Sequence, residues 1–143
     1  MDHNRLITDL ITDEGFISHA YKDSEGYLTI GIGRMVDKRL GGGISRDEAM
    51  LLLRHDIADI CKELDEKASW WRGLPDRGQE AFVNMAFNLG WPRLSKFENM
   101  IDALKAGDYP TAANEALNSK WAKQVGTRAM RIADIFRSLA HGA

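Results

Sequence analysis

The sequence of 143 residues has one cysteine, three prolines and no long apolar run. The single Cys61 excludes an internal disulfide and is too little for the usual structural zinc site. Near the N-terminus, Asp9 and Asp13 interrupt the apolar residues, so neither a secretory signal nor a membrane span is expected. These absences predict a globular protein that is made in the cytoplasm and has no stable membrane insertion.

The net charge of −2 is unevenly distributed along the chain. Residues 1–66 carry 8 Lys or Arg against 14 Asp or Glu, which gives −6, whereas residues 67–143 carry 11 against 7, which gives +4. A basic half suits an anionic polymer, while an acidic half can supply reactive carboxylates. The alternative is a chance distribution of solvated surface charge.

The first third of the chain predicts a short helix followed by strands. Apolar spacing favours a helix over 5–12, ended by Gly15. The segments 16–21 and 27–33 are rich in β-branched and aromatic residues and flank a polar turn, which indicates a small antiparallel hairpin or sheet. The glycines at 31 and 33 suggest a strand whose backbone another group approaches closely.

The rest of the chain predicts helices. Ser45-x-x-Glu48 is a capping box, and it begins an apolar periodicity that continues to about residue 66. Beyond it, all periodic segments are helical, and their predicted starts are a capping box at Asp76-x-x-Gln79, Ser95, Pro110 in a first turn, and a cap at Thr127. The fold class is therefore α+β.

Two carboxylates flank the predicted hairpin. Glu14 stands where the first helix ends, Asp23 lies in the turn, and the hydroxyl of Thr29 follows on the next strand. Paired carboxylates suit glycoside hydrolysis, in which one donates a proton and the other activates a water or attacks the sugar. The alternative is that these groups are turn caps or surface charges.

These residues lie in blocks that resemble the phage-type lysozymes (endolysins) of glycoside hydrolase family 24, which include the enzymes of T-even phages. Glu14, Asp23 and Thr29 match the family spacing of a Glu, eight residues, an Asp, five residues and a Thr. The other matching blocks follow in family order at 84–90, 119–121 and 127–131. The resemblance covers most of the chain.

The resemblance implies one lysozyme-like domain over 1–143 with a cleft between two lobes. Its parts are a small β lobe at about 14–45, a connecting helix at about 45–66, and a helical lobe at about 67–143 that includes the N-terminal helix. The implied activity is hydrolysis, with inversion, of the β-1,4 bond between N-acetylmuramic acid and N-acetylglucosamine in bacterial peptidoglycan. Glu14 is implied as the general acid, and Asp23 and Thr29 as the groups that hold the attacking water.

Further site residues also come from the resemblance. Arg128 matches an arginine that pairs with the catalytic glutamate and orients it, and the alternative is that it belongs to the basic surface of the last helix. Met35 and Phe87 match positions that line the family's cleft, and Phe87 is equally explained as a core residue. Asn88, near a helix end, is expected to reach the saccharide, where the family often has a longer amide. The family often has histidine where this chain has Arg34, so an ion pair built on that histidine is not expected.

The implied partner is the glycan strand of peptidoglycan, bound by a monomer without cofactor or metal. The implied setting is lysis of a bacterial host, with the enzyme waiting in the host cytoplasm and reaching the periplasm through a holin lesion. One rival is a lytic transglycosylase, which Asp23 and Thr29 disfavour. The others are a non-catalytic peptidoglycan-binding module and a nucleic-acid-binding protein, and the pI near 6.1 disfavours the latter.

Overall fold

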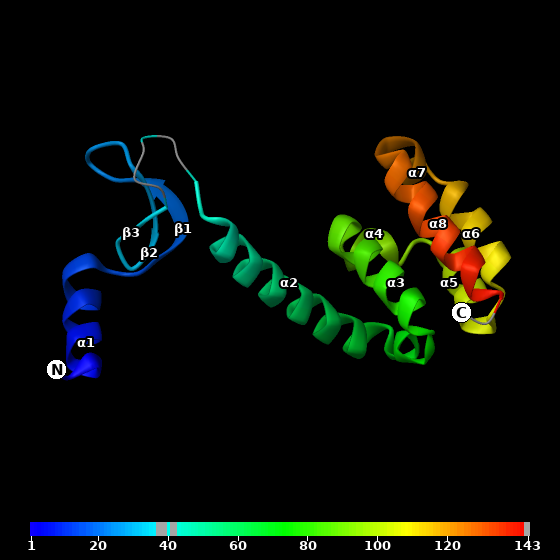
Figure 1. Ribbon diagram of the computed structural model, residues 1–143, viewed down its shortest axis with the longest axis horizontal. Helices are drawn as coiled ribbons and strands as arrows, with labels where there is room; N and C mark the ends of the chain where they lie inside the picture. Colours follow the sequence, from blue (N-terminus) through cyan, green and yellow to red (C-terminus); the bar gives the residue numbers. More distant parts are fainter. Residues whose placement is uncertain (37–39, 41–42, 142–143) are drawn as a thin grey trace. The chain divides into compact units, whose positions relative to one another are not determined.

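The computed structural model describes residues 1–36, 40 and 43–141 (Figure 1). The chain divides into two units, Met1–Leu52 and Leu53–Ala143, and their boundary lies within the long helix α2 (Arg46–Lys67). The predicted α+β class is confirmed, because the helices accompany one small antiparallel sheet. No helix in the part of the chain described here is both long and apolar enough to cross a membrane.

The first unit begins with helix α1 (His3–Glu14), whose two ends are both closed. The Asp2 side chain accepts a hydrogen bond from the Arg5 N–H at 3.1 Å, which satisfies a free donor of the first turn. At the other end Gly15 has φ 74° and donates its N–H to the Ile11 carbonyl at 2.8 Å. The predicted stop at Gly15 is confirmed, and it leaves Glu14 as the last residue of the helix.

A three-stranded antiparallel sheet follows in the order β1-β2-β3 (Figure 1). Its strands are β1 (Ile17–Lys22), β2 (Leu28–Gly31) and β3 (Arg34–Met35). β2 is the central strand, since it pairs with both neighbours. The turn before it contains Asp23, and the turn after it contains Gly33, so the short strand β2 connects the two segments that concern the site.

Helix α2 starts as the sequence predicts. The Glu48 N–H donates to Ser45 Oγ at 3.2 Å, and the Ser45 N–H donates to Glu48 Oε1 at 3.2 Å, which is a complete capping box. The helix has 22 residues and therefore a length of about 33 Å. Leu51 and Leu52 on it are exposed in the described structure, whereas Leu64 near its end is fully buried.

The second unit is a helical bundle with one apolar core. After the 3-10 helix η1 (Ser69–Gly73), its helices are α3 (Asp76–Leu89), α4 (Trp91–Leu94), α5 (Glu98–Ala106), α6 (Tyr109–Leu117), α7 (Lys120–Val125) and α8 (Thr127–Leu139). α8 contacts α3, α6 and α7, so it is the central helix of the bundle. Alanines 112, 113 and 116 on α6 are fully buried, and their small side chains let α6 and α8 approach closely.

Three predicted helix starts are wrong. Asp76 does not cap α3: Pro75 is the N-cap residue, and Gln79 donates its side-chain amide to the Arg72 and Leu74 carbonyls instead, each at 2.9 Å. α8 has Gly126 as its N-cap, and Thr127 is already helical. Ser95 does not start a helix either. It is the C-cap residue of α4, its backbone N–H donates to the Trp91 carbonyl, and α5 begins only at Glu98.

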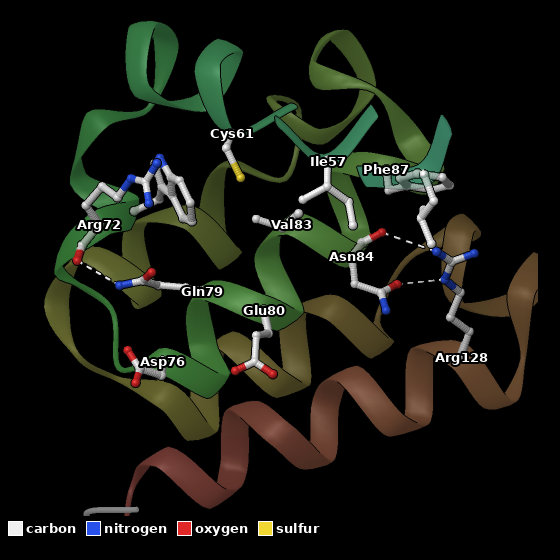
Figure 2. Close-up of a pocket in the computed structure, with 12 residues that line it drawn as sticks. Ile57, Cys61, Arg72, Asp76, Gln79, Glu80, Val83, Asn84, Phe87 and Arg128 are labelled. Carbon is white, nitrogen blue, oxygen red and sulfur yellow. Dashed lines mark hydrogen bonds between the residues drawn. The ribbon is translucent and has the colours of Figure 1, made fainter. Parts of the chain in front are cut away.

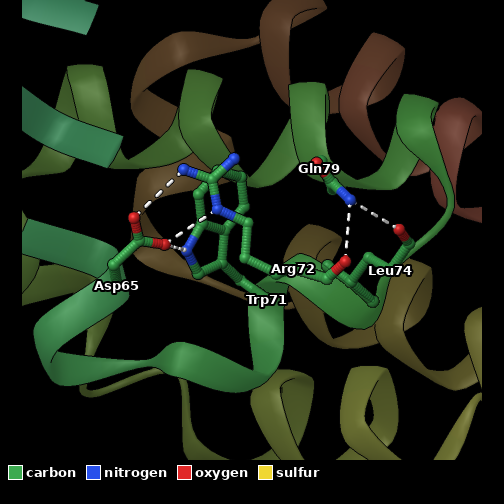
Figure 3. Close-up of polar contacts among 5 residues, drawn as sticks. All are labelled: Asp65, Trp71, Arg72, Leu74 and Gln79. Carbon is green, nitrogen blue, oxygen red and sulfur yellow. Dashed lines mark hydrogen bonds and ion pairs between the residues drawn. The ribbon is translucent and has the colours of Figure 1, made fainter. Parts of the chain in front are cut away.

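A polar cluster fixes the connection between α2 and η1 (Figure 3). One oxygen of Asp65 accepts hydrogen bonds from Trp71 Nε1 and Arg72 Nε, each at 2.8 Å, and the other accepts from the Arg72 guanidinium at 3.0 Å. The Arg72 guanidinium also lies over the Trp71 ring, 4.1 Å from its centroid. The hydrogen bonds from Arg72, with a further one from Trp71, lower the pKa of Asp65 despite the opposing effect of desolvation.

The lowered pKa of Asp65 sets the sign of a pH effect on stability. The stabilisation is fully present above the usual aspartate pKa of about 3.9, and it is lost as the pH falls through the lower folded-state pKa. We expect the Tm difference between the parent and Asp65→Asn to be constant from about pH 7 to about pH 5 and to shrink below about pH 4. In Glu66→Gln, which alters an exposed neighbouring carboxylate, the Tm difference should stay small throughout. A difference for Asp65→Asn that grows on acidification would contradict this assignment.

The core of the second unit gives a further prediction. Phe136 on α8 is completely buried among the core residues, so Phe136→Ala should lower the free energy of unfolding by about 3–5 kcal/mol. Met130 lies on the same helix and is 59% exposed, so Met130→Ala should change the free energy of unfolding by less than about 1 kcal/mol. Urea unfolding followed by circular dichroism at 222 nm measures both changes, and equal effects would be inconsistent with this core.

Candidate active site

The three predicted catalytic residues all belong to the first unit and are arranged around β2. Glu14 ends α1, Asp23 lies in the turn between β1 and β2, and Thr29 is the second residue of β2. The structure thus brings these residues to neighbouring elements of one unit. Their catalytic roles stay predictions.

Asp23 is held by the turn in which it lies. Its Oδ1 accepts the N–H groups of Glu25 at 2.9 Å and Tyr27 at 2.8 Å, and its backbone N–H donates to the Tyr27 carbonyl at 2.9 Å. The Gly26 N–H closes the turn on the Asp23 carbonyl at 3.0 Å. Within the described residues the second carboxylate oxygen, Oδ2, has no hydrogen bond. One oxygen therefore fixes the side chain, and the other remains available to a ligand or water.

Thr29 is connected to Asp23 through a single residue. The Thr29 hydroxyl donates to the Tyr27 carbonyl at 3.1 Å, while the N–H of the same Tyr27 donates to Asp23. Thr29 is 4% exposed, and it is the one buried polar residue found in the described parts of the chain. Because its proton is committed to Tyr27, its oxygen can act towards a further group only as an acceptor. Met35, predicted to contact substrate, lies directly opposite Thr29 in the sheet and is 43% exposed.

Glu14 lies against the turn that follows β2. A Cβ added to Gly33 would come 2.7 Å from the Glu14 carboxyl carbon and closer still to Oε2, so any larger residue here would displace the end of the Glu14 side chain. Gly33 also has φ 62°, a conformation that other residues rarely adopt. The close approach predicted for the two glycines is therefore confirmed at Gly33, and it stays a prediction at Gly31, where no described atom beyond the chain neighbours lies within 4 Å of an added Cβ.

Glu14 has no polar partner among the described residues of the first unit. Its side chain is exposed, and it makes no hydrogen bond or ion pair with any residue that the structure describes. Phe16, two residues after Glu14 in the sequence, is also 68% exposed. Among the described residues of the first unit, the contact that places the carboxyl group is therefore the one with Gly33.

The remaining predicted residues lie in the second unit. Arg128 donates from Nε to the Asn84 side-chain oxygen at 2.9 Å and from its guanidinium to the Asn84 carbonyl at 3.3 Å (Figure 2). Glu14 belongs to the first unit and Arg128 to the second, and the predicted pairing of the two residues stays a prediction. Phe87 is 45% exposed, which excludes its being a buried core residue.

Asn88 is oriented by a buried tryptophan. Trp121 is 5% exposed, and its Nε1 donates to Asn88 Oδ1 at 2.7 Å. Because the amide oxygen of Asn88 is occupied, its NH2 group is the part that can contact a ligand, as a donor. The sequence predicted a turn at Asp23, but it did not predict that the Tyr27 N–H anchors the Asp23 carboxylate. It also did not predict the contact between Trp121 and Asn88, which are 33 positions apart.

Two pockets occur in the described part of the second unit. The first, of about 690 Å³, is mainly apolar, with Leu53, Ile57, Val83 and Phe87 on its walls and Arg128 at one end (Figure 2). The second, of about 590 Å³, surrounds Trp121 and has a more polar lining. Neither pocket contains a group of three or more potential metal ligands, and the described residues as a whole contain none.

Comparison with known proteins gives consistent matches. Residues 12–134 match the model of the family described as Phage lysozyme. The chain is 31% identical to the pre-baseplate central spike protein Gp5 of Enterobacteria phage T4, over 84% of this chain and 25% of that protein. It is 24% identical to Probable T4-type lysozyme 1 of Dictyostelium discoideum, over 88% of this chain and 89% of that protein. It is 28% identical to an endolysin of Acyrthosiphon pisum secondary endosymbiont phage 1, over 77% and 72%.

The coverage of these relatives differs. The chain spans only about a quarter of the length of the spike protein, but most of the length of the Dictyostelium lysozyme and of the endolysin.

The contact between Glu14 and Gly33 can be tested by a matched pair of glycine variants. Gly31 and Gly33 both have positive φ, so Gly31→Ala and Gly33→Ala should each lower the free energy of unfolding by about 1–2 kcal/mol. Only Gly33→Ala should also displace the Glu14 side chain, because only there does the new Cβ meet it. The 13C resonance of the Glu14 carboxyl measures the displacement. An unchanged resonance in Gly33→Ala, or an equal change in Gly31→Ala, would contradict the contact.

Proposed function

Because the chain belongs to the phage lysozyme family, and so to the lysozyme-type glycoside hydrolases, we propose that it hydrolyses the β-1,4 bond between N-acetylmuramic acid and N-acetylglucosamine in peptidoglycan with inversion. The observation that carries this proposal is that Asp23 and Thr29 both form hydrogen bonds with the backbone of Tyr27, at the start of β2. At the other end of β2, Gly33 in the following turn contacts Glu14. An acid, a base and a water-holding hydroxyl are the groups that an inverting mechanism needs.

In this mechanism Asp23 and Thr29 hold the attacking water. The water donates one hydrogen to Asp23 Oδ2 and the other to Thr29 Oγ1, since both atoms are available as acceptors. A lone pair of the water oxygen then points at the anomeric carbon. As the new C–O bond forms, the proton passes from the water to Asp23, which acts as the general base.

Glu14 is the general acid in the same step. Its proton goes to the glycosidic oxygen as that bond breaks, so the leaving sugar departs as a neutral alcohol.

The spacing of the elements supports inversion over retention. The turn of Asp23 and the turn of Gly33 lie at opposite ends of β2, and three steps along a strand of four residues span about 10 Å. The carboxyls of inverting enzymes are about 6.5–9.5 Å apart, whereas those of retaining enzymes are about 5–5.5 Å apart. Asp23 and Glu14 at two ends of this strand suit the larger separation, which leaves room for a water.

The substrate contacts follow from exposure and orientation. Met35 lies opposite Thr29 and offers an apolar surface to a sugar ring, and Phe87 is half exposed. Asn88 presents its NH2 group, which can donate to the carbonyl of an N-acetyl substituent. We also propose that Arg128 orients Glu14 as the resemblance implies, with Asn84 holding the arginine side chain.

The biological setting that we propose is lysis of a bacterial host. The match to an endolysin supports it. In this setting the enzyme waits in the host cytoplasm, acts as a monomer and reaches the periplasm through a holin lesion. The match to the central spike protein Gp5 favours a second setting, in which the chain is part of a baseplate spike. Detection of the chain in purified phage particles separates the second setting from the first.

The reaction is tested with variants of the two carboxylates. Glu14→Gln and Asp23→Asn should each lower kcat on purified sacculi by about 100-fold or more, because each removes a proton-transfer group. Glu25→Gln is the matched control, since it alters an exposed carboxylate of the same turn and keeps the N–H that anchors Asp23. NMR of the first product should show the α anomer at the new reducing end.

The same digests distinguish the alternatives. Hydrolysis adds one water to the product mass, whereas a lytic transglycosylase leaves an anhydro end. Wild-type activity in Glu14→Gln would remove Glu14 as the acid. A parent protein that binds sacculi without releasing any product would leave only the non-catalytic binding module.

A further inference from the structure

Arg34 connects the small sheet to the start of the long helix. It is the first residue of β3, and its guanidinium forms an ion pair with the Glu48 carboxylate in the first turn of α2. Both residues belong to the first unit, as do Glu14, Asp23 and Thr29. The pair therefore joins the strand beside the proposed catalytic residues to a helix end that is fixed by its own capping box.

The Glu48 end of this pair is rigid. Its Oε1 accepts the Ser45 N–H and its backbone N–H donates to Ser45 Oγ, so the side chain is held while Oε2 contacts Arg34. The hydrogen bond from the Ser45 backbone, together with the contact with Arg34, holds the pKa of Glu48 below its usual value. Glu48 thus offers Arg34 a fixed negative charge at neutral pH.

The Arg34 end lies between two residues of the proposed site. Gly33, immediately before it, is the residue against which the Glu14 carboxyl rests, and Met35, immediately after it, pairs with Thr29. β3 itself has only two residues and pairs with β2 alone, at Ile30 and Thr29. Its backbone is held by this pairing and by the Val36 N–H, which donates to the Leu28 carbonyl at 2.7 Å, and the Arg34 ion pair is an additional anchor, to α2, which follows β3 in the sequence.

We propose that Arg34 is a positioning residue, which through its ion pair with Glu48 holds the backbone of Gly33 beneath the Glu14 carboxyl and keeps Met35 opposite Thr29. This inference rests on the proposed function. Arg34 does not contact the reacting atoms; it acts by fixing the turn that places the acid. An exposed ion pair contributes little to global stability, and here the side chains are 63% and 33% exposed. The effect should therefore be found in catalysis rather than in Tm.

The test compares kcat, KM and Tm of the full chain on purified sacculi. Arg34→Gln should lower kcat by about tenfold, because a displaced acid loses transition-state stabilisation. KM should rise by a smaller factor than kcat falls, because Met35 is the one proposed substrate contact next to Arg34, whereas Phe87 and Asn88 lie on α3. Arg34→Lys keeps the charge and should recover most of kcat. The matched control is Arg77→Gln, which breaks the comparably exposed Arg77–Glu80 pair on α3 and should leave kcat unchanged.

A second variant keeps the test informative if Arg34→Gln unfolds. Glu48→Gln retains an acceptor for the Ser45 N–H but loses the charge, and it should lower kcat as much as Arg34→Gln does. The double variant should be no worse than either single one, because both remove the same contact. Wild-type kcat in both single variants, additive losses in the double variant, or a loss of kcat that matches a loss of folded protein would overturn the proposal.

The failure of this inference is distinguishable from the failure of the proposed function. If Glu14→Gln loses activity and Arg34→Gln does not, the acid assignment stands and the positioning role falls. If Glu14→Gln remains active, the proposed function itself falls, whatever Arg34→Gln shows.

Discussion

The arrangement of the proposed site depends on the bond between the Asp23 carboxylate and the backbone N–H of Tyr27. That bond, with the one from Glu25, fixes one carboxylate oxygen, and the other has no hydrogen-bonding partner among the described residues. The Tyr27 carbonyl then takes the Thr29 proton and leaves the hydroxyl oxygen as an acceptor. The backbone N–H and carbonyl of Tyr27 therefore orient both the proposed base, Asp23, and the hydroxyl that we propose helps it to hold water.

The other half of the proposed chemistry depends on a residue without a side chain. Glu14 has no hydrogen-bonding partner among the described residues, and it is placed by the helix end at Gly15 and by contact with Gly33. The first unit thus contains one carboxylate that two backbone N–H groups hold, Asp23, and one that is placed by contact with a glycine, Glu14.

Features encoded within a few residues could be predicted from the sequence. The end of α1 at Gly15, the capping box of Ser45 and Glu48, and the turn that holds Asp23 are local, and the structure contains all three. The predicted caps at Asp76 and Thr127 failed, because Gln79 bonds to the preceding segment and Gly126 provides the backbone conformation before α8. Contacts between distant residues, such as Trp121 with Asn88 across 33 positions, leave no signal in residue spacing.

The placement of the tryptophans has a consequence for spectroscopy. All four of them, Trp70, Trp71, Trp91 and Trp121, lie between Leu53 and Ala143, and the first unit contains only tyrosines as fluorophores. Indole emission excited at long wavelength therefore reports on the helical unit alone. A glycan that binds to the sheet without altering the helical unit leaves this signal unchanged. A fluorescent probe of the first unit, which contains Glu14 and Asp23, therefore has to be introduced, for example by the substitution Tyr21→Trp.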